Sequence, residues 1–213
     1  MSASVNLDLV MLVPGKDERE TFDELLSSRG ASLGIRQLRY EILVHPRRDP
    51  GCLHEAPDIL QPYQNRANRC LIVMDHQGSG QEDQPATEVM ADLKGRMESS
   101  GWTGRAEVLM LQPELENWVW SDSPHVDSVM GWKERNPPLR KWLENQGVWP
   151  AGSAKPGQPK ESFQAALREV RIRRSSAIYR QLAARVSLER CHDPEFLAFR
   201  RIMQEWFPIT VTS

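Results

Sequence analysis

Four short runs of apolar residues, each bounded by turn residues, mark the first half of the chain. They span residues 5–13, 38–44, 70–74 and 106–111. Short runs that are apolar throughout are typical of strands buried on both faces, as in a parallel sheet. Segments with the helical spacing of apolar residues separate these runs. Strands that alternate with helices predict an α/β fold in which a parallel sheet is flanked by helices.

Apolar residues that recur every three or four positions predict the helices. The first strand ends at Pro14-Gly15, and Asp17 and Glu18 then fall in a first helical turn, where acids favour the helix dipole. Residues 87–97 carry one apolar face, and a Pro-rich passage over residues 56–65 is expected to be partly helical. Three helices are predicted in the second half, at 163–170, 177–186 and 194–207.

Changes in composition divide the chain into four parts. Residues 1–122 hold the predicted α/β domain, and residues 123–147 form a Trp-rich helical connector. Residues 148–160 are rich in Pro, Gly, Ser and Ala, which is typical of a linker. Residues 161–213 form a basic helical C-terminal extension.

Composition also narrows the class of protein. The net charge of −2, with 39% apolar and 26% charged residues, excludes a protein whose whole surface coats nucleic acid or anionic membrane. No apolar run approaches the roughly 20 residues that span a bilayer, and the N-terminus does not resemble a signal peptide. The three scattered cysteines indicate reduced thiols. We therefore expect a cytoplasmic protein without a membrane partner.

Residues able to bind metal or phosphate follow three of the predicted strands. These candidates are Lys16, Glu18, Asp75, Gly78, Gly80, Glu114 and Glu116. The carboxyl ends of parallel strands lie at one edge of the sheet, so acids that are distant in sequence can converge there. Mg²⁺ prefers carboxylate oxygens and water as ligands, and such a site could hydrolyse phosphodiesters.

Each candidate also has a structural interpretation. Asp75 would serve equally well as the cap of the following turn. Gly78 and Gly80 fit a phosphate cradle, but ordinary turns use glycine for the same backbone freedom. Glu114 and Glu116 would complement a helix dipole, and for Glu114 we favour that role.

Other polar and aromatic groups favour structural roles. His45 and His54 flank Arg47-Arg48-Asp49 without the spacing of metal ligands, so we expect both histidines in an exposed loop. Trp118 and Trp120 are interpreted as packing residues rather than as a platform for stacking bases.

The strand-end motifs resemble those of Toprim-like proteins, which have a Rossmann-like sheet. The motifs are Gly15-Lys-x-Glu18 after the first strand, Asp75-x-x-Gly-x-Gly80 after the third, and Pro113-x-Leu-Glu116-x-Trp118 after the fourth. Small members of the RloB type, and related uncharacterised families of bacterial anti-phage defence loci, are the most similar. The resemblance covers about residues 5–122. Pro159-Lys160, Tyr179-Arg180 and Pro194-Glu-Phe196 extend it weakly.

Two departures from the family pattern concern the metal site. Active Toprim enzymes carry a Glu directly after the first strand as general acid or base, and this chain has Pro14. They usually carry Asp-x-Asp after the third strand, and here Gln77 replaces the second acid. A neutral amide supplies less charge to Mg²⁺. The resemblance therefore implies a degenerate metal site held by Asp75 and Glu116, with Glu18 or Asp17 partly replacing the missing Glu.

The C-terminal third has an excess of positive charge. Residues 155–201 contain 11 Lys and Arg against 5 Asp and Glu, whereas residues 1–154 contain 16 against 23. The arginines that recur at helical intervals are Arg171, Arg173, Arg174, Arg180 and Arg185. Such a face could bind nucleic-acid phosphates, dock on the acidic sheet domain or a partner, or simply be solvated. We assign Arg173, Arg174 and Arg180 as candidate nucleic-acid contacts.

Two functions follow as hypotheses. The first is a component of a bacterial anti-phage defence system that uses a reduced metal site and acts with other defence proteins or with DNA or RNA. The alternative is an active Mg²⁺-dependent nuclease that uses Asp75 and Glu116, with Glu18 assisting. A nucleotide sensor built on the glycine turn has no supporting motif.

Overall fold

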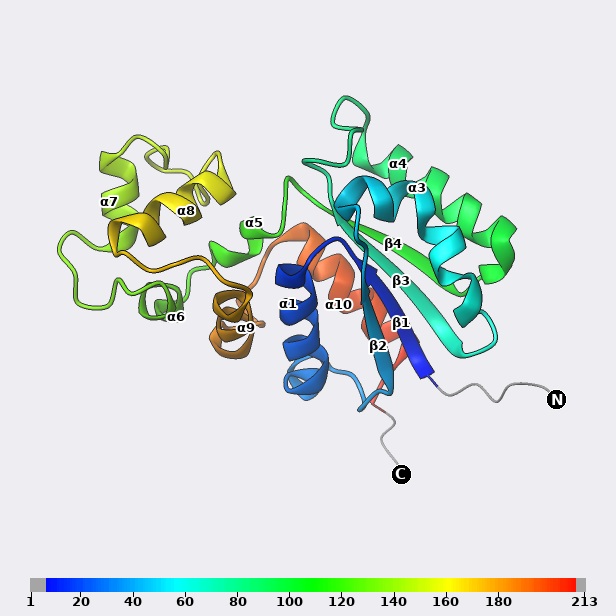
Figure 1. The fold of residues 1–213 in the computed structure, drawn as a ribbon. Helices are drawn as coiled ribbons and strands as arrows, with labels where there is room; N and C mark the ends of the chain where they lie inside the picture. The colour runs from blue at the N-terminus through cyan, green and yellow to red at the C-terminus, as the bar shows by residue number, and fades with distance from the viewer. Residues whose placement is uncertain (1–6, 210–213) are drawn as a thin grey trace.

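The computed structural model describes residues 7–209 and contains a four-stranded sheet whose strands all run parallel (Figure 1). The strand order is β2-β1-β3-β4. The strands are β1 (Leu7–Val13), β2 (Tyr40–Val44), β3 (Ala67–Asp75) and β4 (Ala106–Leu111). All four predicted strands are present, so the predicted α/β fold is confirmed. Residues 5 and 6 of the first predicted strand lie outside the described residues, and β3 is longer at both ends than the predicted run.

Alternate side chains of the central strands enter two separate cores, which explains why the strands are apolar throughout. Val10 and Ile72 point into one core, and Met11 and Leu71 point into the other. The first core is covered by α3 (Arg48–Leu60) and α4 (Ala86–Met97), and short turns follow each helix at η1 (Gln61–Tyr63) and η2 (Glu98–Trp102). The second is covered by α1 (Lys16–Ser27), α2 (Gly30–Leu33) and helices from the end of the chain.

The second half of the chain is helical. Its helices are α5 (Glu116–Val119), α6 (Pro124–Val129), α7 (Leu139–Asn145), α8 (Pro159–Glu169), α9 (Ser176–Arg185) and α10 (Pro194–Trp206). The three helices predicted at the C-terminus are present, although α8 begins four residues early. Helices α6–α8 lie to the side of the sheet, whereas α9 and α10 pack with α1 in one core (Figure 1).

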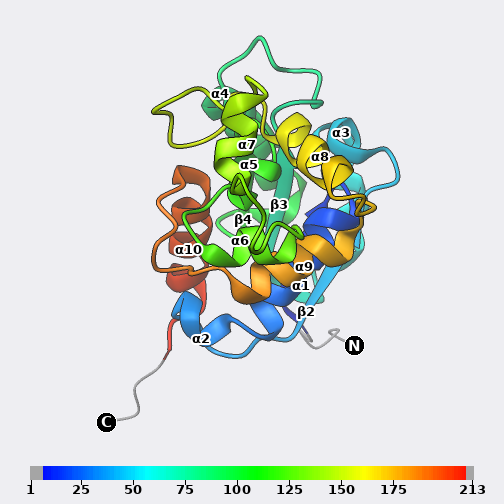
Figure 2. The same cartoon turned by 90° about the vertical axis from the view of Figure 1, so that its left-hand side faces the viewer.

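Indole groups hold α6–α8 together and attach them to the rest of the protein. Trp120 donates a hydrogen bond to the carbonyl oxygen of Pro159 at 3.0 Å, and Trp132 donates to that of Ala166 at 3.3 Å. Trp120 also packs edge-on against Trp149. Figure 2, turned to face this side, shows α6–α9 in front of the sheet. Trp118, on α5, packs edge-on against Phe22 on α1. Trp118 and Trp120 are therefore packing residues, as predicted.

One sequence prediction about the fold is wrong. His45 and His54 do not lie in an exposed loop, because His45 is buried and His54, although exposed, lies on α3, which begins at Arg48. Gly51 allows this helix to pack tightly against His45, since a Cβ there would lie 2.0 Å from Nδ1 of His45. This compact corner brings the first turn of α3 to the carboxyl end of the sheet.

The strand order creates a crevice at the carboxyl ends of β1 and β3. The chain leaves β1 for β2 on one side and later returns to β3 on the other side of β1. Open α/β sheets bind ligands at such a reversal of strand order, because the connections diverge there. Within residues 7–209, no helix is long and apolar enough to cross a membrane.

Candidate metal centre

A pocket of about 430 Å³ lies in this crevice. Its walls come from the ends of β2 and β3, from the residues that follow β1, β2 and β4, from the first turn of α8 and from the loop between α8 and α9. The lining residues are Pro14–Glu18, Val44–Pro46, Arg48, Asp49, Asp75, Glu116, Lys160 and Arg174. The pocket is therefore an acidic hollow with basic residues around it.

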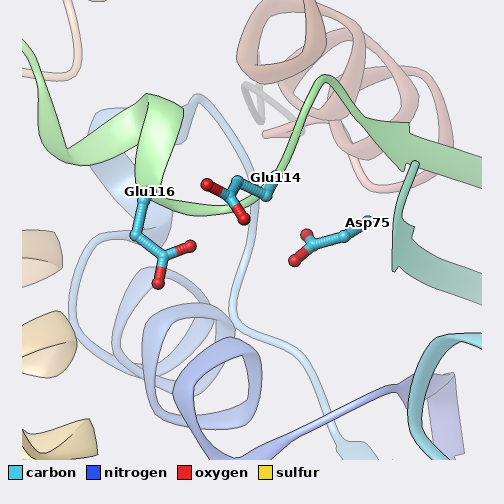
Figure 3. A group of neighbouring side chains, drawn as sticks. All are labelled: Asp75, Glu114 and Glu116. Atoms are coloured by element: carbon cyan, nitrogen blue, oxygen red, sulfur yellow. The ribbon is translucent and has the colours of Figure 1, made fainter. Parts of the chain in front are cut away.

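Three buried carboxylates converge beside the pocket (Figure 3). Asp75 ends β3, Glu114 lies in the turn after β4, and Glu116 begins α5. One carboxylate oxygen from each lies within 4.8 Å of the others, and the exposed fractions are 5%, 4% and 2%. Three oxygen ligands at this spacing can hold a metal ion. Glu114, for which the sequence favours a role on a helix dipole, belongs to this group.

Backbone hydrogen bonds fix Asp75 from two directions. The N–H of Leu115 donates to Oδ1 of Asp75 at 3.0 Å. The N–H of Asp75 donates to Oδ1 of Asp49 at 2.8 Å. Because Leu115 lies between Glu114 and Glu116, the first bond ties the end of β3 directly to the turn that carries the other two acids.

Glu116 is held by two side chains from the C-terminal part of the chain, one on α9 and one in the loop that precedes it. The hydroxyl of Tyr179 on α9 donates to its Oε1 at 2.6 Å, and Arg174 donates to the same oxygen at 3.1 Å. The guanidinium group of Arg174 also pairs with Asp17 at 2.5 Å. Burial raises the pKa of Tyr179, and Glu116 raises it further, so the hydroxyl stays protonated as a donor.

Glu114 is held by the start of α8. The backbone N–H of Lys160 donates to Oε1 at 2.9 Å, and its ammonium group pairs with Oε2 at 3.2 Å. Burial works to lower the pKa of Lys160, but Glu116 and Glu114 hold it above its ordinary value. Lys160 is therefore charged, and it neutralises part of the carboxylate group.

Glu18 lies on α1 and also lines the pocket, with 8% of its surface exposed. Its carboxylate folds back over Gly15, where an added Cβ would lie 2.6 Å from Oε2. Burial raises the pKa of Glu18 to about 7, and the charges of Asp17, Asp49 and Glu116 contribute. At neutral pH this group can therefore both accept and donate a proton.

Asp75, Asp49 and Glu114 are also harder to ionise than in water. Burial raises the pKa values of Asp75, Asp49 and Glu114, and for Asp75 the charges of Glu18, Asp49 and Glu116 raise the pKa further. A divalent cation would relieve this repulsion, because it would attract all of these carboxylates. The chemistry of the donors thus fits a hard cation such as Mg²⁺.

Some predicted phosphate contacts are engaged elsewhere. Gly78 and Gly80 have φ angles of 94° and 81°, but their N–H groups donate to the carboxylate of Glu82 at 2.6 and 3.3 Å. This pattern favours the turn interpretation for both glycines. Lys16 lines the pocket and is exposed, whereas Arg173 is exposed outside it.

Arg180 connects α9 to α1. Its guanidinium group pairs with Glu20 and Glu24 at 3.0 Å and with Asp23 at 3.5 Å. This is the docking alternative for the basic helices, in which the arginine binds the acidic domain of the same chain. Of the arginines that we assigned to nucleic acid, only Arg174 reaches the pocket.

Sequence reasoning missed three residues of the site. Lys160 and Tyr179 lie in segments quoted only for a weak family likeness, so that likeness was the one signal for them. Asp49 carried no signal, because its segment was interpreted as an exposed loop. Glu18, Asp75 and Glu116, the three acids predicted from strand ends, all line this one pocket.

Comparison of the chain with models of known protein families found no match, and comparisons with curated proteins and with solved structures found none either.

Proposed function

We propose that this protein is a Toprim-like, Mg²⁺-dependent enzyme that hydrolyses phosphodiester bonds in nucleic acid. The observation that carries the proposal is the buried group of Asp75, Glu114 and Glu116, with Glu18 on the same pocket. Because Gln77 stands where active Toprim enzymes carry an acid, the sequence alone suggests a metal site with too little negative charge. With Glu114, three acids lie within reach of one ion and supply that charge. The sequence likeness to small Toprim-like proteins supports a place in anti-phage defence beside partner proteins.

Each residue has a role that follows from its position. Asp75, Glu114 and Glu116 would hold the ion, which when bound neutralises phosphate charge and orients water. Glu18 accepts the proton of the attacking water, whose oxygen forms a bond to phosphorus while the bond to the leaving sugar oxygen breaks and that oxygen takes a proton from solvent. Burial raises the pKa of Glu18, which makes its carboxylate a stronger base than an exposed one.

Lys160 and Arg174 are proposed as phosphate ligands. Both line the pocket, and their side chains are 37% and 38% exposed. A cation bound by Glu114 and Glu116 would compete with these two residues for the same carboxylates. Their positive charges would then be available for the oxygens of a phosphate group.

A binding protein without catalysis is the second candidate. The observation in its favour is that Lys160 and Arg174 already pair with Glu114 and Glu116. Two of the three carboxylates thus have cationic partners within the chain. A scaffold with a reduced metal site would use such pairs for stability and hold nucleic acid or a partner without cutting it.

Cleavage of plasmid DNA, linear DNA and RNA in Mg²⁺ or Mn²⁺ tests the proposal. We expect metal-dependent cutting by the wild type and its loss in Asp75→Asn and Glu116→Gln, which keep the size of each side chain. Glu88→Gln, at an exposed position on α4, is the matched control and should cut normally. Cutting that survives both site substitutions, or no cutting by the wild type, would reject the enzyme in favour of the binding protein.

A further inference from the structure

Asp49 lines the pocket from the segment that follows β2. The predicted acids of the site, in contrast, end or follow β1, β3 and β4. Asp49 lies in the first turn of α3, beside Arg48, whose φ angle is 54°. His45 precedes this turn, and its Nδ1 accepts a hydrogen bond from the N–H of Arg47 at 3.0 Å. The close packing of His45 against Gly51 leaves little freedom to the turn, so the position of Asp49 is well defined.

The contact between Asp49 and Asp75 satisfies a strand-end donor. The N–H of His76 bonds to Leu111 in β4, so the N–H of Asp75 points to the opposite side, toward β1. There β1 has already ended at Val13. Oδ1 of Asp49 accepts this N–H at 2.8 Å in place of a strand carbonyl.

The second carboxylate oxygen of Asp49 faces the turn that follows Asp75. A Cβ added at Gly78 would lie 4.0 Å from Oδ2. Gln77, in the same turn, is exposed, and its backbone N–H donates to Pro113. Asp49 belongs to none of the motifs that follow the first, third and fourth strands, yet its carboxylate contacts the carboxyl end of β3.

We propose that Asp49 is a positioning residue for the metal centre: by accepting the N–H of Asp75 it sets the direction of the Asp75 carboxylate toward Glu114 and Glu116. The Asp75 carboxylate is restrained by Leu115 and its backbone by Asp49, so both ends of the side chain are fixed. Supporting groups of this kind orient metal ligands and typically change affinity by about 10–100-fold when removed. The inference rests on the proposed metal site.

The test measures the affinity of the full chain for Mn²⁺ alone, in Asp49→Ala and Asp49→Asn. Asn keeps an oxygen that can accept the N–H of Asp75, whereas Ala removes it. We expect Asp49→Ala to weaken Mn²⁺ binding by about 10–100-fold, and Asp49→Asn to stay within about 3-fold of the wild type. Asp58→Ala, exposed on the same helix, is the control and should bind like the wild type.

Two results would overturn the inference: unchanged affinity in Asp49→Ala, or losses of equal size in Asp49→Ala and Asp49→Asn. Circular dichroism and thermal unfolding identify a variant that fails to fold, and Asp49→Asn then decides the question, because a large loss in a folded Asn variant contradicts positioning through the oxygen. A wild type that binds no Mn²⁺ would instead reject the metal site itself, so the two failures are distinct.

Discussion

The buried carboxylate of Glu18 predicts an unusual dependence of stability on pH. Its pKa rises from the ordinary value of 4.5 to about 7. Each unit corresponds to about 1.4 kcal/mol, so the ionised carboxylate lowers the free energy of unfolding by roughly 3 kcal/mol. Because the folded-state pKa is the higher one, this loss is absent below pH 4.5, grows as the pH rises, and is complete above pH 7.

Glu18→Gln should remove that loss, because the amide has a similar size and no charge. At pH 8 we expect the variant to be more stable than the wild type by up to about 3 kcal/mol. For a chain of this length, that corresponds to a rise in Tm of up to roughly 10 °C. At pH 4, below the ordinary pKa of the group, the two proteins should have nearly the same Tm.

Thermal and urea unfolding between pH 4 and pH 8.5, with EDTA present, would measure the difference. Glu88→Gln, at an exposed site, should follow the wild type at every pH. If the difference in stability between Glu18→Gln and the wild type does not change with pH, burial does not raise the pKa of Glu18 in the folded protein. The role of Glu18 as a group that titrates near neutrality would then be refuted.

The remaining predictions concern residues around the pocket. Lys160→Gln should tighten Mn²⁺ binding, because it removes the cation that competes for Glu114, and it should slow cleavage; weaker binding would contradict the competition. Arg180→Ala should lower Tm without changing Mn²⁺ affinity or cutting, since the acids that pair with Arg180 lie on α1. Weaker binding of nucleic acid by this variant would instead support the nucleic-acid contact predicted from the sequence. Gly51→Ala should destabilise the protein by about 1–3 kcal/mol through collision with His45, as measured in urea; a neutral effect would show that the α3 corner can relax.

The strands and the acids that end them could be predicted from the sequence. Short apolar runs identify buried strands, and the polar residues that end them must lie at one edge of a parallel sheet. That reasoning predicts that Glu18, Asp75 and Glu116 lie close together. It could not separate Glu114 from an ordinary helix acid, because both roles need the same residue at the same position.

Only the tertiary structure decided which charges neutralise one another. Lys160 meets Glu114 across 46 positions of sequence, and Arg174 meets Asp17 across 157. Local periodicity sets the type and the apolar face of each helix, but a single turn of offset in packing would bring another side chain into the pocket. The close packing of α3 against His45 likewise placed Asp49, since the ends of elements are set by contacts with neighbours rather than by their own pattern.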